Sequence, residues 1–370
     1  MTARTALVTG GSGYIGLHVV NSLLEAGWTV HTTVRSLRNE TKTRPLNSLA
    51  DKHPGKLRLF EADLLVADSF TEAMQGCSTV IHVASPFLVP ERVKNPETEL
   101  IRPALEGTRN VLGSVNKTES VKRVVLTSSG AWLMQIQVVG CYTLHTLPRT
   151  LVGAMYGDAA DVLQSEKATL HEGCWNTTSS PSHNAYQHSK TLAEREAWKM
   201  AEAQNRWNLV VICPGLVLGP SLSPASDSGS LALIDQLLSG LLMVGVPALS
   251  WALVDVRDVA AAHVRAGEVP EAKGRYIVAE SKTTSCLELS KSFKQVHSKP
   301  RVLPTWNLPA LVFRLFAPFA GLSQAWVTAN WGIGFSLDNS RGIKELGITY
   351  RPVEEMLKDH YQSWAAQHQG

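Results

Sequence analysis

Two residues with complementary acid–base chemistry, Tyr186 and Lys190, are four positions apart in the segment Tyr186-Gln-His-Ser-Lys190. The surrounding residues have a helical pattern, and a spacing of four places both side chains on one face of a helix. A free tyrosine has a pKa of about 10, which is too high for an efficient acid at neutral pH. A lysine cation one turn away is expected to lower that pKa, so the pair predicts a proton donor assisted by a cation.

A hydroxyl group is available to act on the same substrate oxygen. Residues 121–128 are predicted to form a strand, and two serines, Ser128 and Ser129, stand at its end. We predict that Ser129 polarises the oxygen that the tyrosine protonates, with Ser128 as the alternative if the strand register is shifted by one residue. His188 is expected to face elsewhere on its helix and is left out of the predicted site.

A glycine-rich segment near the start of the chain has the pattern of a phosphate-binding loop. Its sequence is Val8-Thr9-Gly10-Gly11-Ser12-Gly13-Tyr14-Ile15-Gly16, and it is predicted to join a strand to a helix. Glycine lets the backbone turn sharply and approach a pyrophosphate, while the helix N-terminus offers unpaired N–H groups. The segment predicts a dinucleotide site, although an ordinary tight turn between a strand and a helix remains the alternative.

The end of the second predicted strand indicates which dinucleotide binds. An NAD site usually has a carboxylate there, about twenty residues after the glycines, for the ribose 2′-hydroxyl. Arg35 stands at this position instead, with Arg38 and Lys42 close behind it. A guanidinium can bind a 2′-phosphate through two hydrogen bonds, so the sequence predicts NADP(H) as the cofactor. The alternative is that Arg35 is only a solvated charge at a strand end.

The elements that must position these residues alternate between strand and helix patterns in the first part of the chain. Such alternation predicts an α/β fold, a doubly wound parallel (Rossmann) sheet with a smaller C-terminal substrate-binding lobe. Strands are predicted at residues 5–9, 28–34, 57–61, 78–83, 121–128 and 208–213, and helices at residues 16–26, 98–115 and 184–204.

The composition is that of a globular protein with a sizeable core. The 370 residues are 44% hydrophobic and carry a formal net charge of +3. Because the net charge is small and the positive and negative residues are interspersed, we expect no overall basic surface for nucleic acid or an anionic membrane. Five widely spaced cysteines without a CxxC pair argue against a disulfide framework or a metal site and for a reducing compartment. We therefore expect a cytoplasmic protein without a bound metal.

One uncharged stretch, residues 237–254, is long enough to raise the question of a membrane span. Gly240, Gly245 and Pro247 interrupt it, so we interpret it as the end of a helix, a turn and a buried strand. The apolar run that begins at Ala6 is too short for a signal peptide or a spanning helix. No membrane span is expected.

Together these motifs resemble those of the extended short-chain dehydrogenase/reductases, which are also described as the NAD-dependent epimerase/dehydratase family. Within that family, the motifs resemble those of the group of dihydroflavonol 4-reductases, cinnamoyl-CoA reductases and fungal carbonyl reductases. Matching segments run nearly from end to end and include residues 62–64, 80–86, 124–129, 213–220, 254–260 and 338–347. They are specific for the family but not for a substrate.

The resemblance implies hydride transfer from the nicotinamide to a carbonyl carbon, with Ser129 and Tyr186 on its oxygen and Lys190 supporting both Tyr186 and the ribose. Asp63 and Leu64 would contact the adenine. The implied cofactor-binding residues are Gly10, Ser12, Gly13, Tyr14, Ile15, Gly16, Arg35, Asp63, Leu64, Val83, Ala84, Ser85, Tyr186, Lys190, Pro214, Gly215, Leu216 and Val217.

We predict an NADP-binding domain over residues 1–220 and a mixed α/β substrate lobe over 221–370, with a segment at about 251–280 returning to the main domain. The connection between Ser129 and Tyr186 is about twenty residues longer than the family leads us to expect. The surplus is placed at residues 133–153.

Two interpretations of this predicted insertion stay open. The favoured one is an incidental insertion, such as a translated intron, that loops out of the fold. The other is a lid over the substrate pocket, in which Tyr142 and His145 would touch the ligand.

The predicted substrate is an aldehyde or ketone of a small, aromatic or polyketide-like metabolite, and the enzyme is expected to be a monomer or homodimer. Alternative functions are a nucleotide-sugar epimerase or dehydratase, a hydroxysteroid-type dehydrogenase, and a redox sensor that binds NADP without turnover. The C-terminal aromatic residues are expected to be mostly core, although some could line an apolar pocket; they are Trp306, Phe313, Phe316, Phe319, Trp326 and Trp331.

Overall fold

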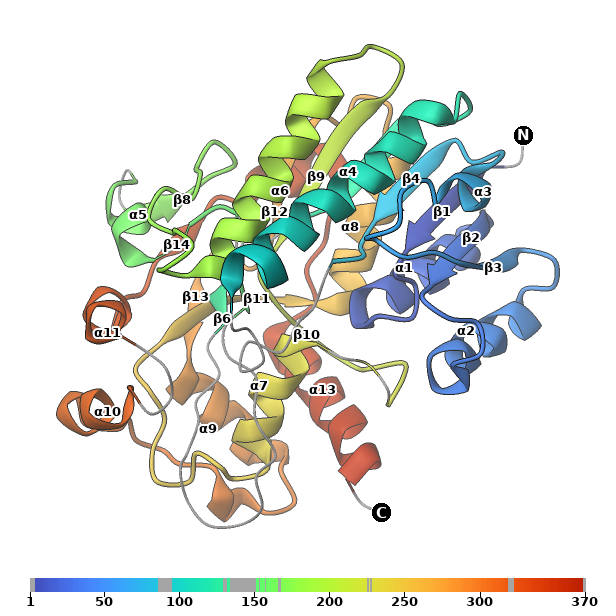
Figure 1. The fold of residues 1–370 in the computed structure, drawn as a ribbon. Coiled ribbons are helices and arrows are strands. Elements are labelled where there is room, and N and C mark those ends of the chain that lie inside the picture. The colour runs from blue at the N-terminus through green and yellow to red at the C-terminus, as the bar shows by residue number, and fades with distance from the viewer. Residues whose placement is uncertain are drawn as a thin grey trace.

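A seven-stranded sheet forms the centre of the molecule (Figure 1). The computed structural model describes residues 4–85, 95–128, 132–133, 151–152, 154–156, 158–165, 168–224, 226, 228–318 and 323–368. In the order β12-β9-β5-β4-β1-β2-β3, every neighbouring pair is parallel, which confirms the predicted doubly wound α/β fold. The strands are β1 (Thr5–Thr9), β2 (Thr29–Val34), β3 (Leu57–Glu61), β4 (Thr79–His82), β5 (Arg123–Thr127), β9 (Asn208–Pro214) and β12 (Gly274–Val278).

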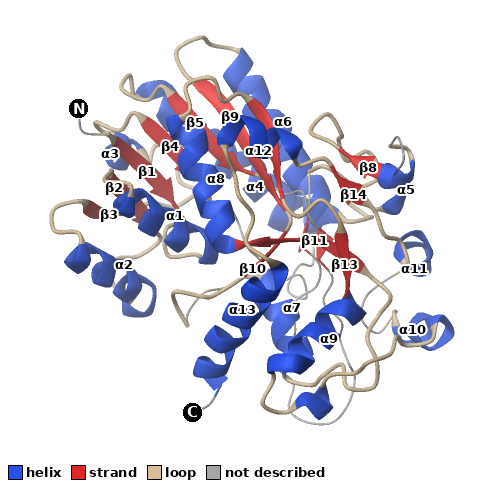
Figure 2. Cartoon of the chain, turned by 180° about the vertical axis from the view of Figure 1, so that it is seen from behind, coloured by secondary structure: helices blue, strands red, loops and turns tan. Residues whose placement is uncertain are grey.

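Helices cover both faces of the sheet, because parallel strands need crossover connections. One face carries α3 (Thr71–Met74), α4 (Arg102–Lys117) and α6 (Ala185–Glu202). The other face, seen in Figure 2, carries α1 (Tyr14–Glu25), α2 (Glu40–Lys52), α8 (Val256–Glu268) and α12 (Ser340–Leu346). Helices α4 and α6 pack along each other, and so do α1 and α8.

The sheet divides the hydrophobic core into two clusters, one on each face. Successive residues of a strand point to opposite faces, so Leu7 joins one cluster while Val8 joins the other. Val124 and Val125 of β5 divide in the same way. Because both faces are buried, the central strands β5 and β9 contain continuous apolar runs, Val124–Leu126 and Leu209–Cys213, and this made them recognisable in the sequence. The observed bounds of the predicted strands agree within two residues. Helix α4 begins at Arg102 and not at residue 98 as predicted, because a π-helical turn, Glu97–Ile101, precedes it.

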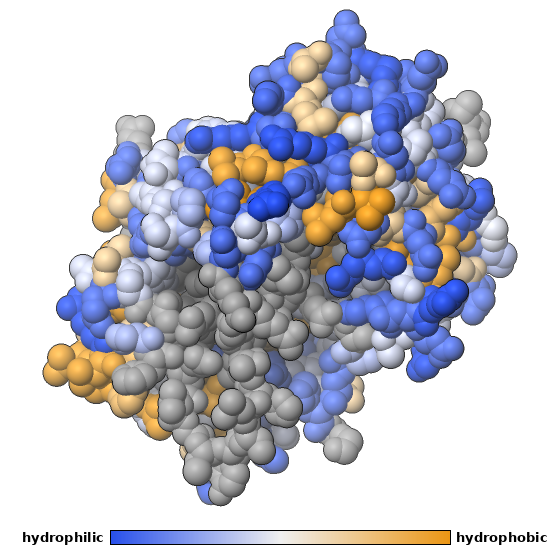
Figure 3. Space-filling model, viewed as in Figure 1, coloured by the Kyte–Doolittle hydropathy of each residue, from blue (hydrophilic) through white to orange (hydrophobic). Residues whose placement is uncertain are grey.

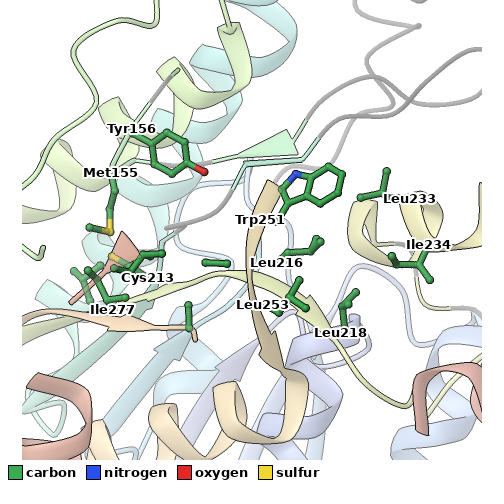
Figure 4. Close-up of a cluster of buried hydrophobic side chains, with 14 of the residues drawn as sticks. Met155, Tyr156, Cys213, Leu216, Leu218, Leu233, Ile234, Trp251, Leu253 and Ile277 are labelled. Carbon is green, nitrogen blue, oxygen red and sulfur yellow. The ribbon is translucent and has the colours of Figure 1, made fainter. Parts of the chain in front are cut away.

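The C-terminal lobe is built around a three-stranded sheet that packs below the main one (Figure 2). Its core, shown in Figure 4, places Trp251 and Leu253 beside Leu216, and these lie near Leu233 of α7. The lobe's elements are β10 (Leu216–Leu218), β11 (Ser250–Asp255), β13 (Thr283–Ser285), α7 (Gly229–Leu238), α9 (Cys286–Val296), α10 (Ala310–Phe316), α11 (Gln324–Asn330) and α13 (Val353–His368). Smaller elements are α5 (Ala159–Leu163), η4 (Pro300–Val302), and the paired strands β8 (Thr169–Leu170) and β14 (Ser336–Leu337).

The lobe and the main domain exchange chain segments. Within residues 251–280, α8 packs against α1, and β12 pairs with β9 at the edge of the main sheet. Strand β11, by contrast, pairs with β10 and β13 in the lobe. The uncharged stretch at 237–254 holds the end of α7, a turned segment and β11. No helix of the described residues is long and apolar enough to cross a membrane.

Side chains of the C-terminal lobe correct one expectation and leave others in place. Phe313 and Trp326 are buried, as expected for core residues. The expectation of a core position is wrong for Trp306 and Phe316, because the side chains of both are more than half exposed. Phe319 lies outside the described residues. The four described cysteines are free thiols, namely Cys77, Cys174, Cys213 and Cys286.

Candidate active site

The glycine-rich segment forms a tight cradle between β1 and α1. Gly10 has a φ of +70°, a conformation that favours glycine. A Cβ on Gly16 would lie 2.2 Å from the Gly10 carbonyl oxygen, so no larger residue fits there without movement. Gly13 donates its N–H to the Gly10 oxygen at 3.0 Å and provides no side-chain cap for α1. The first N–H groups of α1 are therefore presented toward the loop, where an anion can bind them.

Not every side chain of the cradle faces this loop. The Tyr14 hydroxyl donates to the carbonyl of Gly219 at 2.9 Å, and its ring is buried. Ile15 packs against the core cluster on the α1 face of the sheet. Ser12 is only half-buried. Tyr14 and Ile15 can thus contribute backbone groups to a phosphate site, whereas their side chains anchor the helix.

Arg35 follows β2 directly and is exposed. Its guanidinium makes no ion pair or hydrogen bond with another described residue, so it is available to an anionic ligand. Asp63 is half-buried, and its carboxylate accepts from the Leu65 backbone N–H at 2.8 Å in a local turn. The neighbouring Leu64 lines a small cavity of about 30 Å³ between α4, α6 and the sheet.

Tyr186 and Lys190 meet at Ser85, three residues beyond β4. The Lys190 ammonium donates to the Ser85 hydroxyl at 2.5 Å, and Tyr186 also hydrogen-bonds to this hydroxyl. Lys190 Nζ lies 5.6 Å from the centre of the Tyr186 ring. The chain enters α6 through Asn184, which has a φ of 58° and belongs to a residue type that tolerates this conformation. The predicted helical pair is therefore present and lies at the carboxyl edge of the sheet.

Burial changes the pKa values of this pair in a way that differs from the sequence-based expectation. Removal from water raises the pKa of Tyr186, and its hydrogen bond to Ser85 opposes this only in part. Burial also lowers the pKa of Lys190 to about 8. The expected lowering of the tyrosine pKa by the cation is not found here, because desolvation disfavours the charged form of both groups. Tyr186 is consequently held in its protonated form.

His82, at the end of β4, lies behind the pair and was missed by the sequence analysis. Its Nδ1 is 2.8 Å from the Thr9 hydroxyl, which in turn accepts from the Ala84 N–H at 3.1 Å. Burial, with a smaller effect from the Lys190 charge, lowers the pKa of His82 to about 3. His82 and Lys190 both line the small cavity described above. Because the imidazole of His82 is neutral, Lys190 is the positively charged residue among the described residues of that lining. His82 lies in the segment 80–86, which resembles the family, but its contact with Thr9 joins β4 to β1 and could not be predicted from that segment alone.

The predicted serines have different outcomes. Ser129 lies outside the described residues. The Ser128 hydroxyl donates to the Glu194 carboxylate at 2.5 Å, so it is already engaged with α6. Glu194 in turn forms a buried ion pair with Arg275 of β12, with Nε and Oε1 2.7 Å apart. The pairing links three elements at the site's edge, and sequence reasoning missed it because its members are far apart in the chain.

The segment predicted to seat the nicotinamide passes between the two sheets. A Cβ on Gly215 would lie 2.3 Å from the Ala252 carbonyl oxygen, which fixes the close approach of the two backbones. Leu216 and Val217 are buried in opposite core clusters, and Pro214 ends β9. Val83 and Ala84 leave β4 beside the cradle, since a Cβ on Gly10 would lie 3.0 Å from Ala84. These residues adjoin the site mainly through their backbones.

A short hairpin stem marks the predicted insertion. β6 (Trp132–Leu133) pairs antiparallel with β7 (Leu151–Val152). β7 contacts α6 and β6 contacts α7, so the stem stands between the main domain and the lobe. Residues 134–150, including Tyr142 and His145, lie outside the described residues.

Fold and site together define a dinucleotide-binding oxidoreductase with a tyrosine–lysine pair. The chain belongs to the NAD dependent epimerase/dehydratase family, whose sequence model matches residues 6–136 and 150–279. The break in that match, residues 137–149, falls within the predicted insertion.

Known reductases resemble the chain over most of its length. A cinnamoyl-CoA reductase of Medicago truncatula is 34% identical over 359 residues, covering 96% of this chain and 94% of its own. A tetraketide alpha-pyrone reductase of Arabidopsis thaliana is 38% identical and covers 74% of this chain and 77% of its own. The crystal structure of the yeast methylglyoxal/isovaleraldehyde reductase Gre2 with NADPH is 26% identical, covers 99% of each chain and has a TM-score of 0.72. The predicted group and the predicted class, oxidoreductase, are confirmed.

Proposed function

We propose that the protein is an NADPH-dependent reductase of aldehydes or ketones of small aromatic or polyketide-like metabolites. The observation that carries this proposal is the convergence of Tyr186 and Lys190 on Ser85, next to the glycine cradle. The substrate class is supported by the relatives, which are named for cinnamoyl-CoA, tetraketide α-pyrones and anthocyanidins.

The residues of the cradle fit a bound NADPH, which supplies the hydride. Gly10, Gly13 and Gly16 would admit the pyrophosphate, and Arg35 would pair with the 2′-phosphate. The absence of a carboxylate at the end of β2 argues against NADH. Gre2, the yeast reductase described above, was crystallised with NADPH.

Proton transfer is assigned to Tyr186. As the carbonyl carbon gains hydride, negative charge develops on its oxygen, and the phenol donates a proton to it. Ser129 donates a second hydrogen bond to the same oxygen. Lys190 holds Ser85, would bind the nicotinamide ribose and would stabilise the phenolate that Tyr186 becomes after donating its proton.

The catalytic assignment is tested with Tyr186→Phe, which removes only the phenolic oxygen. We expect turnover of a carbonyl panel to fall by about a hundredfold or more, whereas NADPH binding, followed by quenching of tryptophan fluorescence, is retained. Tyr361→Phe, in helix α13 of the lobe, is the matched control and should retain turnover. Unchanged turnover in Tyr186→Phe would remove this residue from the mechanism.

The cofactor assignment is tested by titrating NADPH and NADH. We expect much tighter binding of NADPH by the wild type, and an Arg35→Ser variant that loses this preference without losing NADH affinity. Tighter NADH binding by the wild type would favour an epimerase or dehydratase instead. Binding without turnover of any carbonyl in the panel would favour the redox sensor.

A further inference from the structure

Helix α10 of the lobe presents apolar side chains to solvent. Its inner side chain, Phe313, packs on Trp331 with ring centres 4.8 Å apart. A helix that is apolar on nearly every face is normally buried, yet the outer half of α10 has no cover among the described residues. The uncovered side chains are those of Leu311, Val312, Leu315 and Phe316, of which Leu311 is 72% exposed.

The apolar surface continues onto the neighbouring turn. The Trp306 indole donates to the Val244 carbonyl at 3.1 Å, and the backbones of Val246 and Leu308 pair beside it. This pairing ends two residues before α10 begins. The apolar patch therefore consists of Met243, Val244, Trp306, Leu311, Val312, Leu315 and Phe316, all exposed. Figure 3 shows hydrophobic residues gathered at the lower left, where Figure 1 places α10.

The charge of this part of the chain is one-sided, although the whole chain is nearly neutral. From Leu289 to Leu337 the sequence has no aspartate or glutamate; its charged residues are Lys291, Lys294, Lys299, Arg301 and Arg314. Arg314 belongs to α10 itself. Val302, the neighbour of Arg301, packs on Gly240, whose carbonyl accepts from the N–H of Met243 in the patch. Lys294 donates to the carbonyl of the adjacent Leu303. The nearby Glu288 is held by the cap of α9.

We propose that the apolar patch and its flanking cations form a docking surface for an anionic lipid surface. An interfacial element buries an apolar face at the boundary of headgroups and acyl chains while Lys and Arg meet anionic headgroups. Trp306 has the amphipathic ring that favours this boundary. A second copy of the chain fits less well, because a twofold interface would bring the same cationic segment to both sides, and residues 289–337 contain no acidic residue to pair with it. In this arrangement the patch contacts one leaflet of the bilayer only.

The proposal is tested by co-sedimenting the full chain with vesicles of phosphatidylcholine alone or with added phosphatidylserine. We expect binding to the anionic vesicles that weakens at high salt. Leu315→Ser/Phe316→Ser should reduce that binding by about tenfold or more. The control, Leu65→Ser/Val66→Ser, alters an exposed apolar pair on the turn after β3 and should bind like the wild type. Thermal unfolding and NADPH binding of each variant establish that it is folded.

Absence of binding to either vesicle would overturn the proposal, as would equal loss in the patch and control variants. Size-exclusion chromatography with light scattering provides the other arm. A dimer that the patch variant alone abolishes, together with no vesicle binding, would assign the surface to a second copy of the chain. Neither result bears on turnover, so the proposed reductase function is judged separately.

Discussion

Lys190 is an ammonium in a largely dry site, and this makes the reaction pH-dependent. Burial lowers its pKa to about 8, so the charge is lost as pH rises through that value. We expect kcat/KM for NADPH, which reports groups of the free enzyme, to fall above about pH 8. Ionisation of Tyr186 does not account for this fall above pH 8, because burial raises the pKa of its phenol. A profile that stays flat to about pH 10 would contradict the assignment.

Folding stability should respond to the same group with the opposite sign. The unfolded chain keeps the lysine proton up to about pH 10.4, whereas the folded chain releases it at about 8. Between these values the unfolded state binds more protons, so stability rises with pH. The cost of burying the charge is fully present below pH 8. Lys190→Met should therefore unfold at a higher temperature than the wild type at pH 7, and the difference should shrink toward pH 10.

Site residues could be predicted where their chemistry is carried by neighbours in the sequence. The tyrosine–lysine pair shares one helix, and the glycines share one turn. Ser85 was predicted beside the cofactor, but its bond to Lys190 joins residues 105 positions apart, and no local pattern signals that contact. The balance between burial and charge that sets the pKa of Tyr186 likewise depends on the assembled site.

Among the elements, α6 places two of its glutamates, Glu194 and Glu196, in very different surroundings. Glu194 is buried, accepts from Ser128 of the site strand and pairs with Arg275, whereas Glu196 pairs with the exposed Arg109. We expect Glu194→Ala to lower the free energy of unfolding by about 3–5 kcal/mol, because it leaves a buried guanidinium unpaired. Glu196→Ala should cost less than about 1 kcal/mol. Urea unfolding of both variants measures the difference, and similar costs would contradict this account.

The hairpin stem of β6 and β7 offers a test of the insertion. Leu133 and Leu151 are paired, so residues 134–150 can be replaced by Asn-Gly, which closes two antiparallel strands. If the insertion is incidental, the shortened chain should keep its melting temperature, NADPH affinity and turnover. A fall in turnover with intact NADPH binding would support the lid. A Gly/Ser segment of the original length separates the effect of length from that of sequence.

At the scale of the whole molecule, the strand pattern predicted the sheet well because buried parallel strands are locally recognisable. The sequence pattern does not show which apolar residues of the C-terminal lobe are exposed to solvent. Trp306 and Phe316 look like core residues by type, and only the packing of α10 shows that they face solvent. The return of α8 and β12 was expected at about residues 251–280, but the pairing of β11 within the lobe depends on contacts with β10 that lie far apart in sequence.

These returning elements predict that residues 1–220 do not fold alone. Without β12, strand β9 becomes an uncovered edge and Glu194 loses Arg275. Arg123 of β5 also loses its acceptors, the carbonyls of Ala266, Val269 and Pro270. We expect the 1–220 fragment to show no cooperative thermal transition and no NADPH binding, whereas the full chain unfolds with coincident loss of helical circular dichroism and of NADPH binding. A folded, NADPH-binding 1–220 fragment would show that the main domain is independent and that the returning segments only extend it.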